Sequence, residues 1–214
     1  MSSPLSHWSL PDEGALFVVC GPTGVGKSTL IKHAMQRIAG LEFSVSATTR
    51  PARAGEQDGQ DYHFLSKERF QQLVEQKAFL ENAQVYDNSY GTLRQPTEQC
   101  MSEGRSLILD IDAQGARSVR EAMPDCVSII VLPPSRDTLV DRLRARGTDS
   151  QAVIAARMNQ IVEQIAGVTE VDYVLTNDEL ETAQAVFESI LIAELSRRQR
   201  RKNLVKTVME NLSG

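Results

Sequence analysis

Four apolar runs along the chain have the composition of strands that are buried on both faces of a sheet. Each run is followed, directly or after a longer insertion, by a segment whose apolar residues recur every three or four positions, as on one face of a helix. Alternating strands and helices predict an α/β fold with a doubly wound parallel sheet, which binds ligands at the carboxyl ends of its strands. The runs are Ala15–Cys20, Ser106–Asp112, Val127–Leu132 and Val171–Leu175.

The helix-period segments between and after these runs have recognisable ends. Ser135 follows two prolines and is expected to cap one helix, and Gly147 is expected to end that helix. The basic run Arg197–Lys202 is expected to be a solvated helix face. The other predicted helical segments are Leu30–Ile38, Lys67–Gln76, Gln95–Ser102, one from Gln114, one from Ser150 that includes Ile165, and Leu180–Leu191.

Between the first two apolar runs, residues 44–101 have shorter and more polar elements, which indicate an insertion of small mixed structure. We expect one strand over Glu42–Arg50 that ends in a polar loop, and two more over Asp61–Leu65 and Phe79–Tyr86. The last of these is expected to run into a turn at Asp87–Ser89, after which Tyr90–Thr92 leads to a helix.

Composition narrows the class of protein. A net charge of -5 over 214 residues disfavours non-specific nucleic-acid binding, whereas local arginine clusters suit a small phosphorylated ligand. The cysteines are odd in number and lack C-x-x-C spacing, as buried free thiols in the cytoplasm do. Residues 1–13 lack the features of a signal peptide, and no apolar run could span a membrane. We therefore expect a cytoplasmic protein with a short, poorly ordered lead-in.

The most specific single motif follows the first apolar run. Its sequence, G-x-x-x-x-G-K-S, predicts a phosphate loop between a strand and a helix, because backbone N–H groups and the helix N-terminus can face an anion there. Lys27 would reach the β- and γ-phosphates of ATP, and Ser28 would bind Mg²⁺. The predicted ATP-binding residues of this loop are Gly21, Pro22, Thr23, Gly24, Val25, Gly26, Lys27, Ser28 and Thr29.

A phosphate loop alone does not separate a motor, a switch and a kinase, but six further motifs do. In this order and spacing they resemble guanylate kinases, over roughly residues 15–195. The resemblance implies a P-loop NTPase-type sheet with an inserted GMP-binding region and a helical lid, and transfer of the γ-phosphoryl group of ATP to GMP in purine nucleotide metabolism. The motifs are Ser46–Arg50, Arg53–Glu56, Asp61–Phe64, Phe79–Glu81, Tyr90–Thr92 and Asp110–Gly115.

The resemblance also implies a division of the chain into regions. The core would be built from three separate stretches, with the acceptor-binding region and the lid between them. The expected boundaries are 1–13 for the lead-in, 14–43, 102–134 and 159–214 for the core, 44–101 for the GMP-binding region, and 135–158 for the lid.

For GMP, the resemblance implies two groups of contacts. Planar guanidinium groups and phenols would hold the phosphate, and a carboxylate would accept from the two donors on the guanine edge. The implied phosphate contacts are Arg50, Arg53, Tyr62 and Tyr90, and the implied base-pocket residues are Glu81, Ser46, Gly91, Thr92 and Asp112.

For ATP and catalysis, the resemblance implies that lid arginines and a magnesium site assist the phosphate loop. Asn177 matches the family residue near the adenine, although its position equally fits a helix cap before Asp178. The sequence leaves open which of Asp110 and Asp112 serves the metal and which the base. The implied catalytic residues are Lys27, Arg142, Arg146 and Arg157, and the metal ligands are Ser28 and Asp110.

Departures from the family pattern touch only packing near the pocket. A proline is displaced to position 51, while Asn82 and Ser89 stand where aromatic residues are common. Two alternatives stay open: an inactive guanylate-kinase-like interaction module, and a kinase of the same fold for another phosphorylated acceptor such as a ribose phosphate. An eroded phosphate loop would favour the first, and a missing base-reading carboxylate the second. Monomer and homodimer are equally compatible with the sequence.

Overall fold

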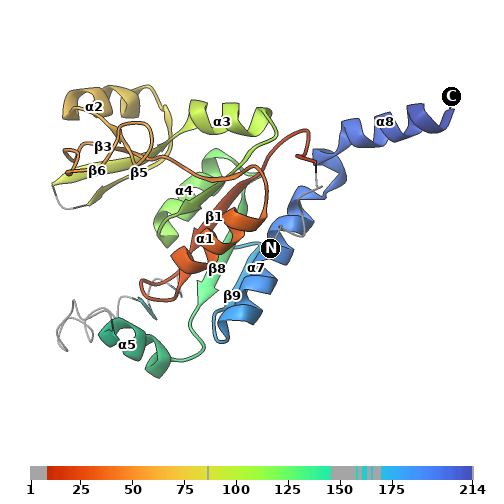
Figure 1. Ribbon diagram of the computed structural model, residues 1–214. Coiled ribbons are helices and arrows are strands. Elements are labelled where there is room, and N and C mark those ends of the chain that lie inside the picture. Colours follow the sequence, from red (N-terminus) through yellow and green to blue (C-terminus); the bar gives the residue numbers. More distant parts are fainter. Residues whose placement is uncertain are drawn as a thin grey trace.

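The core of the molecule is a parallel sheet covered by helices on both faces (Figure 1). The computed structural model describes residues 9–85, 87–145, 158, 161–162, 165 and 170–213. Within them the core sheet has five strands in the order β2-β7-β1-β8-β9, all paired in parallel. The predicted doubly wound sheet is therefore confirmed. The strands are β1 Leu16–Cys20, β2 Leu41–Phe43, β7 Ser106–Asp110, β8 Val127–Leu132 and β9 Tyr173–Thr176.

Alternate residues of β1 face two separate apolar cores, which explains why this strand is apolar throughout. Phe17 and Val19 pack under α1 (Lys27–Arg37) and α7 (Leu180–Leu195). Leu16 and Val18 pack under α3 (Arg94–Ser102) and α4 (Ala113–Ala122) on the other face. Burial of both faces anchors the strand at whose carboxyl end the phosphate loop begins.

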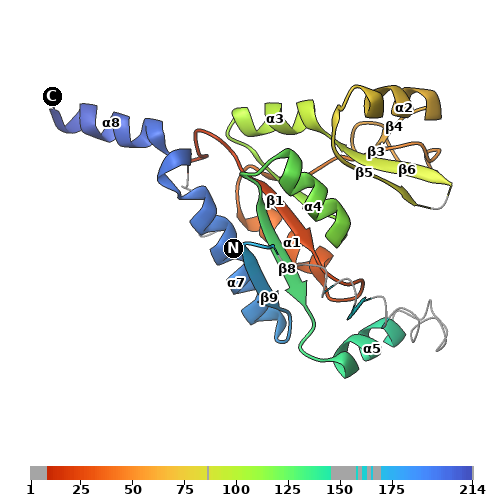
Figure 2. The ribbon, with the colours of Figure 1, turned by 180° about the vertical axis from the view of Figure 1, so that it is seen from behind.

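A second sheet lies beside the core (Figures 1 and 2). Its order is β4-β3-β6-β5, and Phe70 of α2 (Lys67–Glu75) stacks on Phe79 at a ring-centroid distance of 4.5 Å. The strands are β3 Ala47–Thr48, β4 His63–Phe64, β5 Phe79–Val85 and β6 Asn88–Leu93.

Two sequence predictions in this region were wrong. Glu42–Arg50 does not form one strand, because β2 joins the core sheet whereas β3 joins the second sheet. The segment before α3 is the strand β6, so the turn is shorter than the predicted Asp87–Ser89. The sequence of β6 includes Gly91 where a strand would usually have a side chain. A Cβ at Gly91 would lie 2.8 Å from the Phe79 ring of β5, so the close packing of the two strands requires glycine there.

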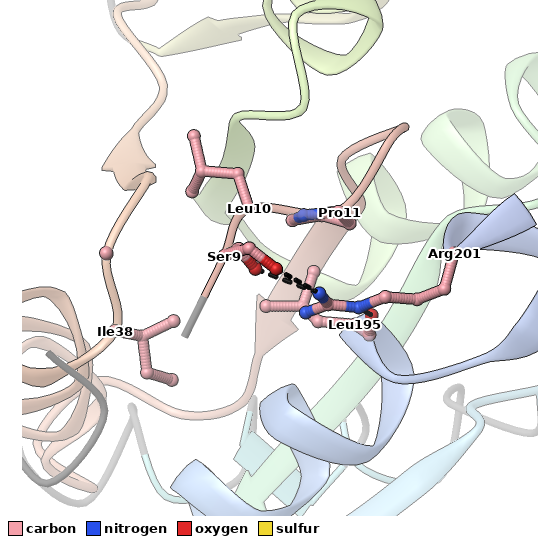
Figure 3. A pocket seen from close by; sticks show the side chains of 7 residues that line it. Ser9, Leu10, Pro11, Ile38, Leu195 and Arg201 are labelled. Carbon is pink, nitrogen blue, oxygen red and sulfur yellow. Dashed lines mark hydrogen bonds between the residues drawn. The ribbon is translucent and has the colours of Figure 1, made fainter. Parts of the chain in front are cut away.

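The expectation of a solvated basic face over Arg197–Lys202 is confirmed for Arg197, Arg198 and Lys202, which are exposed, and is wrong for the two arginines between them. Arg200 and Arg201 are only 5% and 8% exposed. Arg200 donates to the Gly14 carbonyl oxygen, and Arg201 donates to the Ser9 carbonyl oxygen at 2.9 Å and to that of Leu195 at 3.1 Å (Figure 3). The described part of the lead-in, residues 9–13, is thus held in place by the segment that follows α7.

The last helix, α8 (Lys202–Ser213), extends away from the two sheets (Figures 1 and 2). On the lid side, α5 (Arg136–Ala145) begins as predicted, since Ser135 Oγ accepts from the Thr138 N–H at 3.1 Å. The predicted helix end at Gly147 and most of the helix predicted from Ser150 lie outside the described residues. No helix in the described ranges is long and apolar enough to cross a membrane.

Asp172 ties the edge of the core sheet to a covering helix. Its carboxylate accepts from the Ser128 N–H at 2.8 Å and from both terminal nitrogens of Arg120 at 2.8 and 2.9 Å. Chiefly because of the Arg120 guanidinium, the pKa of Asp172 lies well below its usual range. A carboxyl group with a lowered pKa in the folded state stabilises the fold while it is ionised, and that stabilisation is lost as the pH falls through the lowered pKa.

We expect Asp172→Asn to lower the free energy of unfolding at pH 7 by about 1–2 kcal/mol, since charged hydrogen bonds are lost at a partly exposed site. The difference from wild type should shrink as the pH falls below about 4, the ordinary pKa of aspartate. Urea unfolding at pH 7, 5 and 3 measures it. Asp141→Asn, in an exposed pair with Arg144, is the control and should change stability by less than about 0.5 kcal/mol. An Asp172→Asn effect that is the same at all three pH values would contradict this origin.

Candidate active site

The phosphate loop occupies the carboxyl end of β1, where the sequence predicted it. It lines a cleft of about 280 Å³ together with Asp110 at the end of β7. Helix α1 begins at Lys27, so the N–H groups of its first turn lie beside this cleft. The lining residues are Pro22, Thr23, Gly24, Gly26, Lys27, Ser28 and Asp110.

Two glycines of the loop are required by its geometry. Gly21 has φ of 133°, and a Cβ there would lie 2.2 Å from the Val131 carbonyl oxygen of β8. Gly26 has φ of 99°, and a Cβ there would lie 2.4 Å from the Asn177 side chain. Any other residue would combine a strained backbone with a steric clash at these positions.

Lys27 lies across its own loop. Its Nζ donates to the carbonyl oxygens of Gly21 and Pro22 at 2.7 and 3.3 Å, and lies 3.5 Å from Asp110 Oδ1. Burial raises the pKa of Asp110, and the nearby Lys27 opposes that rise. The ammonium group is therefore held at the cleft by three oxygen atoms.

Asn177 holds the phosphate loop through a buried side-chain hydrogen bond. It is 4% exposed, and its Nδ2 donates to the Val25 carbonyl oxygen at 2.7 Å. Its Oδ1 is buried without a hydrogen-bond partner among the described residues. The helix-cap interpretation is wrong, because α7 begins at Leu180 and has Glu179 at its N-cap position.

Only part of the predicted set of lid arginines lies within the described residues. Arg142 donates to the carbonyl oxygens of Asn177 and Asp178 at 2.9 and 3.4 Å, so α5 is joined to the segment that carries Asn177. Arg146 and Arg157 lie outside the described residues.

A buried carboxylate lies in the second sheet. Glu81 of β5 is 9% exposed, and its Oε1 accepts from the Thr92 hydroxyl on β6 at 2.7 Å. Burial raises the pKa of Glu81, the Thr92 hydrogen bonds lower it, and the charge of Asp112 raises it further. Asp110 is the aspartate that contacts Lys27, whereas the charge of Asp112 contributes to the raised pKa of Glu81. Asp112 also caps α4, since its Oδ1 accepts from the Gly115 N–H at 2.8 Å.

The predicted phosphate clasp is a cluster of basic and aromatic side chains. The Arg50 guanidinium lies 5.3 Å from the centre of the Tyr62 ring, and Tyr62 packs edge-on against Tyr90 at 6.0 Å. Arg53 is exposed on the loop that follows Arg50, and Ser46 is half-buried directly before β3. The structure therefore brings together Arg50, Tyr62 and Tyr90.

Sequence reasoning assigned no role to Glu56, although it belongs to one of the matched motifs. Its carboxylate accepts from both terminal nitrogens of Arg50 at 3.0 and 2.8 Å, and from the Arg53 N–H at 2.7 Å. The only signal in the sequence is an acidic residue three positions after Arg53.

A larger cleft of about 420 Å³ lies near the amino end of β1. Four carboxylates line it, which makes it unsuitable for nucleotide phosphates. They belong to Asp12, Glu13, Glu98 and Asp125.

Comparisons with known proteins place the chain in one family. The guanylate kinase family model matches residues 13–194. The guanylate kinase of Alkalilimnicola ehrlichii is 43% identical over 94% of this chain and 99% of its own length, and that of Symbiobacterium thermophilum is 45% identical over 92% and 94%.

A solved structure agrees with these matches. The guanylate kinase from Anaplasma phagocytophilum superposes with a TM-score of 0.67 and 31% identity, covering 95% of this chain and 97% of that one. The sequence motifs, the loop geometry and these relatives lead to one conclusion. The chain belongs to the guanylate kinase family of P-loop kinases.

Proposed function

We propose that this chain transfers the γ-phosphoryl group of ATP to GMP, giving ADP and GDP, in the cytoplasm. The observation that carries the proposal is the end of β7, where two aspartates that are separated by a single residue interact with different groups. Asp110 contacts the phosphate-loop lysine, and Asp112 acts on the buried Glu81. A donor and an acceptor bound at these sites would lie close together, as phosphoryl transfer requires.

The ATP site in this proposal is the cleft at residues 21–29, with Asn177 next to it. The hydroxyl of Ser28, exposed in the first turn of α1, and the Asp110 carboxylate are oxygen donors of the kind that Mg²⁺ prefers. These residues would hold the ion, directly or through water. Bound there with ATP, Mg²⁺ would neutralise charge on the phosphate oxygens.

The GMP site in this proposal is the second sheet with its arginine loop, within residues 44–101. Arg50, Arg53, Tyr62 and Tyr90 would hold the phosphate. Glu81 would accept from the guanine N1–H and 2-amino groups, because a buried carboxylate gains most from partners that donate. Ser46, Gly91, Thr92 and Asp112 would complete the base pocket.

In catalysis, Lys27 would exchange at least one carbonyl contact for the phosphate oxygens between the β- and γ-positions of ATP. Arg142, Arg146 and Arg157 of the lid region, residues 135–158, would add positive charge and exclude water when the lid closes. The phosphoryl group is already electrophilic, so alignment and charge neutralisation suffice.

A coupled assay of ADP release with GMP, dGMP, AMP, CMP, UMP, IMP and ribose phosphates tests the proposal. We expect turnover with guanine nucleotides and little with the others. A chain that binds GMP without turnover would be the interaction module, and one that phosphorylates only a ribose phosphate would be the alternative kinase. Light scattering with and without nucleotides would distinguish monomer from homodimer.

Lys27→Ala should lower kcat by more than tenfold while the Kd for GMP stays within about twofold, because Lys27 contacts the ATP site and not the Glu81 site. Steady-state kinetics and GMP calorimetry measure the two effects. Lys32→Ala removes an exposed lysine from the same helix and serves as the control. Retention of more than a tenth of wild-type turnover would exclude this role for Lys27.

Glu81→Gln keeps the shape of the side chain but replaces one acceptor by an NH₂ donor, which would oppose a guanine donor. We expect kcat/KM for GMP to fall by about a hundredfold, or about 2.7 kcal/mol. IMP keeps the N1–H and lacks the 2-amino group, so its efficiency should fall much less. Competition kinetics with both nucleotides, at constant ATP, measure the contrast.

The same carboxyl group should make GMP binding depend on pH. Burial raises the pKa of Glu81, so lowering the pH through that raised value would protonate the acceptor and raise the KM for GMP. The effect should be absent in Glu81→Gln. If that variant phosphorylates GMP with wild-type efficiency, Asp112 becomes the candidate for base recognition.

A further inference from the structure

The loop between β3 and β4 carries both arginines of the proposed phosphate clasp, yet the residues between and beside them make few packing contacts. Gly55 has φ of 93°, and a Cβ there would meet nothing within 4 Å. Pro51 and Ala52 are exposed as well. Packing therefore does not hold this loop in shape, and polar contacts have to do so.

Glu56 supplies those contacts. Its carboxylate forms a two-bond pair with Arg50, whose side chain is 13% exposed, and also accepts from the Arg53 N–H. The Glu56 N–H donates to the Arg53 carbonyl oxygen at 3.1 Å. One residue thus fixes the guanidinium of the first arginine and the backbone of the second.

Glu56 and Pro51 together use only part of the hydrogen-bonding capacity of Arg50. Glu56 and the Pro51 carbonyl oxygen take both Nη1 hydrogens and one Nη2 hydrogen of the five N–H groups of arginine. The remaining Nε–H and Nη2–H lie side by side on the adjacent edge, in the parallel arrangement that matches two phosphate oxygens. The Tyr90 side chain, which belongs to the same proposed clasp, also hydrogen-bonds to the Arg50 guanidinium and would share it with the phosphate. The Tyr62 and Phe64 rings, 5.3 and 5.8 Å from the guanidinium carbon, limit its rotation further.

Charge supports the same arrangement. The hydrogen bonds from Arg50 and from the Arg53 N–H lower the pKa of Glu56, so it is ionised at neutral pH. An ionised Glu56 reduces the repulsion between the two neighbouring arginines before any phosphate binds.

We propose that Glu56 is a positioning residue for the acceptor phosphate: it holds Arg50 and the Arg53 backbone so that the Nε edge of Arg50 and the Arg53 side chain face one phosphate group. This inference rests on the proposed GMP kinase function. Glu56 itself does not touch the substrate, because like charges would repel.

Calorimetry with GMP and with guanosine, without ATP, tests the proposal. Glu56→Ala should raise the Kd for GMP by at least about tenfold, whereas guanosine, which lacks the phosphate, should bind within about twofold of wild type. Glu56→Gln keeps one acceptor oxygen, so its Kd for GMP should lie between that of wild type and that of Glu56→Ala. The KM for ATP should stay within about twofold for both variants. Glu75→Ala, which removes an exposed carboxylate of α2, is the matched control.

A double-mutant cycle separates positioning from a contact of Glu56 alone. In the Arg50→Ala background, Glu56→Ala should have a much smaller effect on the Kd for GMP. Equal GMP affinity of wild type and Glu56→Ala would overturn the inference, and so would an equal loss of guanosine affinity, which would indicate a collapsed region. If Glu56→Ala does not fold, Glu56→Gln decides. A wild-type chain that neither binds nor phosphorylates GMP would refute the proposed function itself.

Discussion

The close approach of the phosphate loop to β8 is the constraint on which the active site depends. No side chain fits at Gly21, because the Val131 carbonyl oxygen occupies the space that a Cβ would need. The loop is therefore attached to the sheet on the β8 side, while Asn177, just after β9, grips it at Val25. Three adjacent parallel strands thus fix the backbone of the loop, and α1 can present its N-terminus to the phosphates of the proposed ATP site.

The proposed GMP site contains a carboxylate, Glu81, whose surroundings disfavour its ionised form. Burial and the nearby charge of Asp112 both disfavour the ionised Glu81 carboxylate, and the hydrogen bonds from Thr92 offset this only in part. Such an arrangement is unfavourable in a structural role, since an apolar pair at β5 and β6 would stabilise the sheet more. A ligand that donates hydrogen bonds would relieve the cost, so recognition and instability have the same source.

The sequence predicted the core well because its strands are buried on both faces, which leaves continuous apolar runs. In the second sheet it predicted β4 and β5 but missed β3 and β6 as separate strands, since β3 has two residues and β6 contains a glycine that contacts β5. Arg200 and Arg201 looked like solvated charges because their partners are backbone carbonyls, including Gly14 and Ser9, nearly two hundred residues away. The ordered motifs supplied the candidate site residues, but the contacts of Glu56 could be found only from the loop geometry.

Asn177 joins two parts of the proposed catalytic machinery through different groups. Its side chain holds the phosphate loop, whereas its backbone carbonyl accepts from Arg142 of α5. Movement of α5 relative to the loop would have to break the Arg142 hydrogen bonds, which are partly solvated, but it could leave the buried side-chain contact intact. The buried hydrogen bond from Asn177 to the loop is therefore separate from the partly exposed hydrogen bonds between Arg142 of α5, in the proposed lid, and the Asn177 segment. Lid motion need not disturb the phosphate cradle, because the two contacts differ in burial.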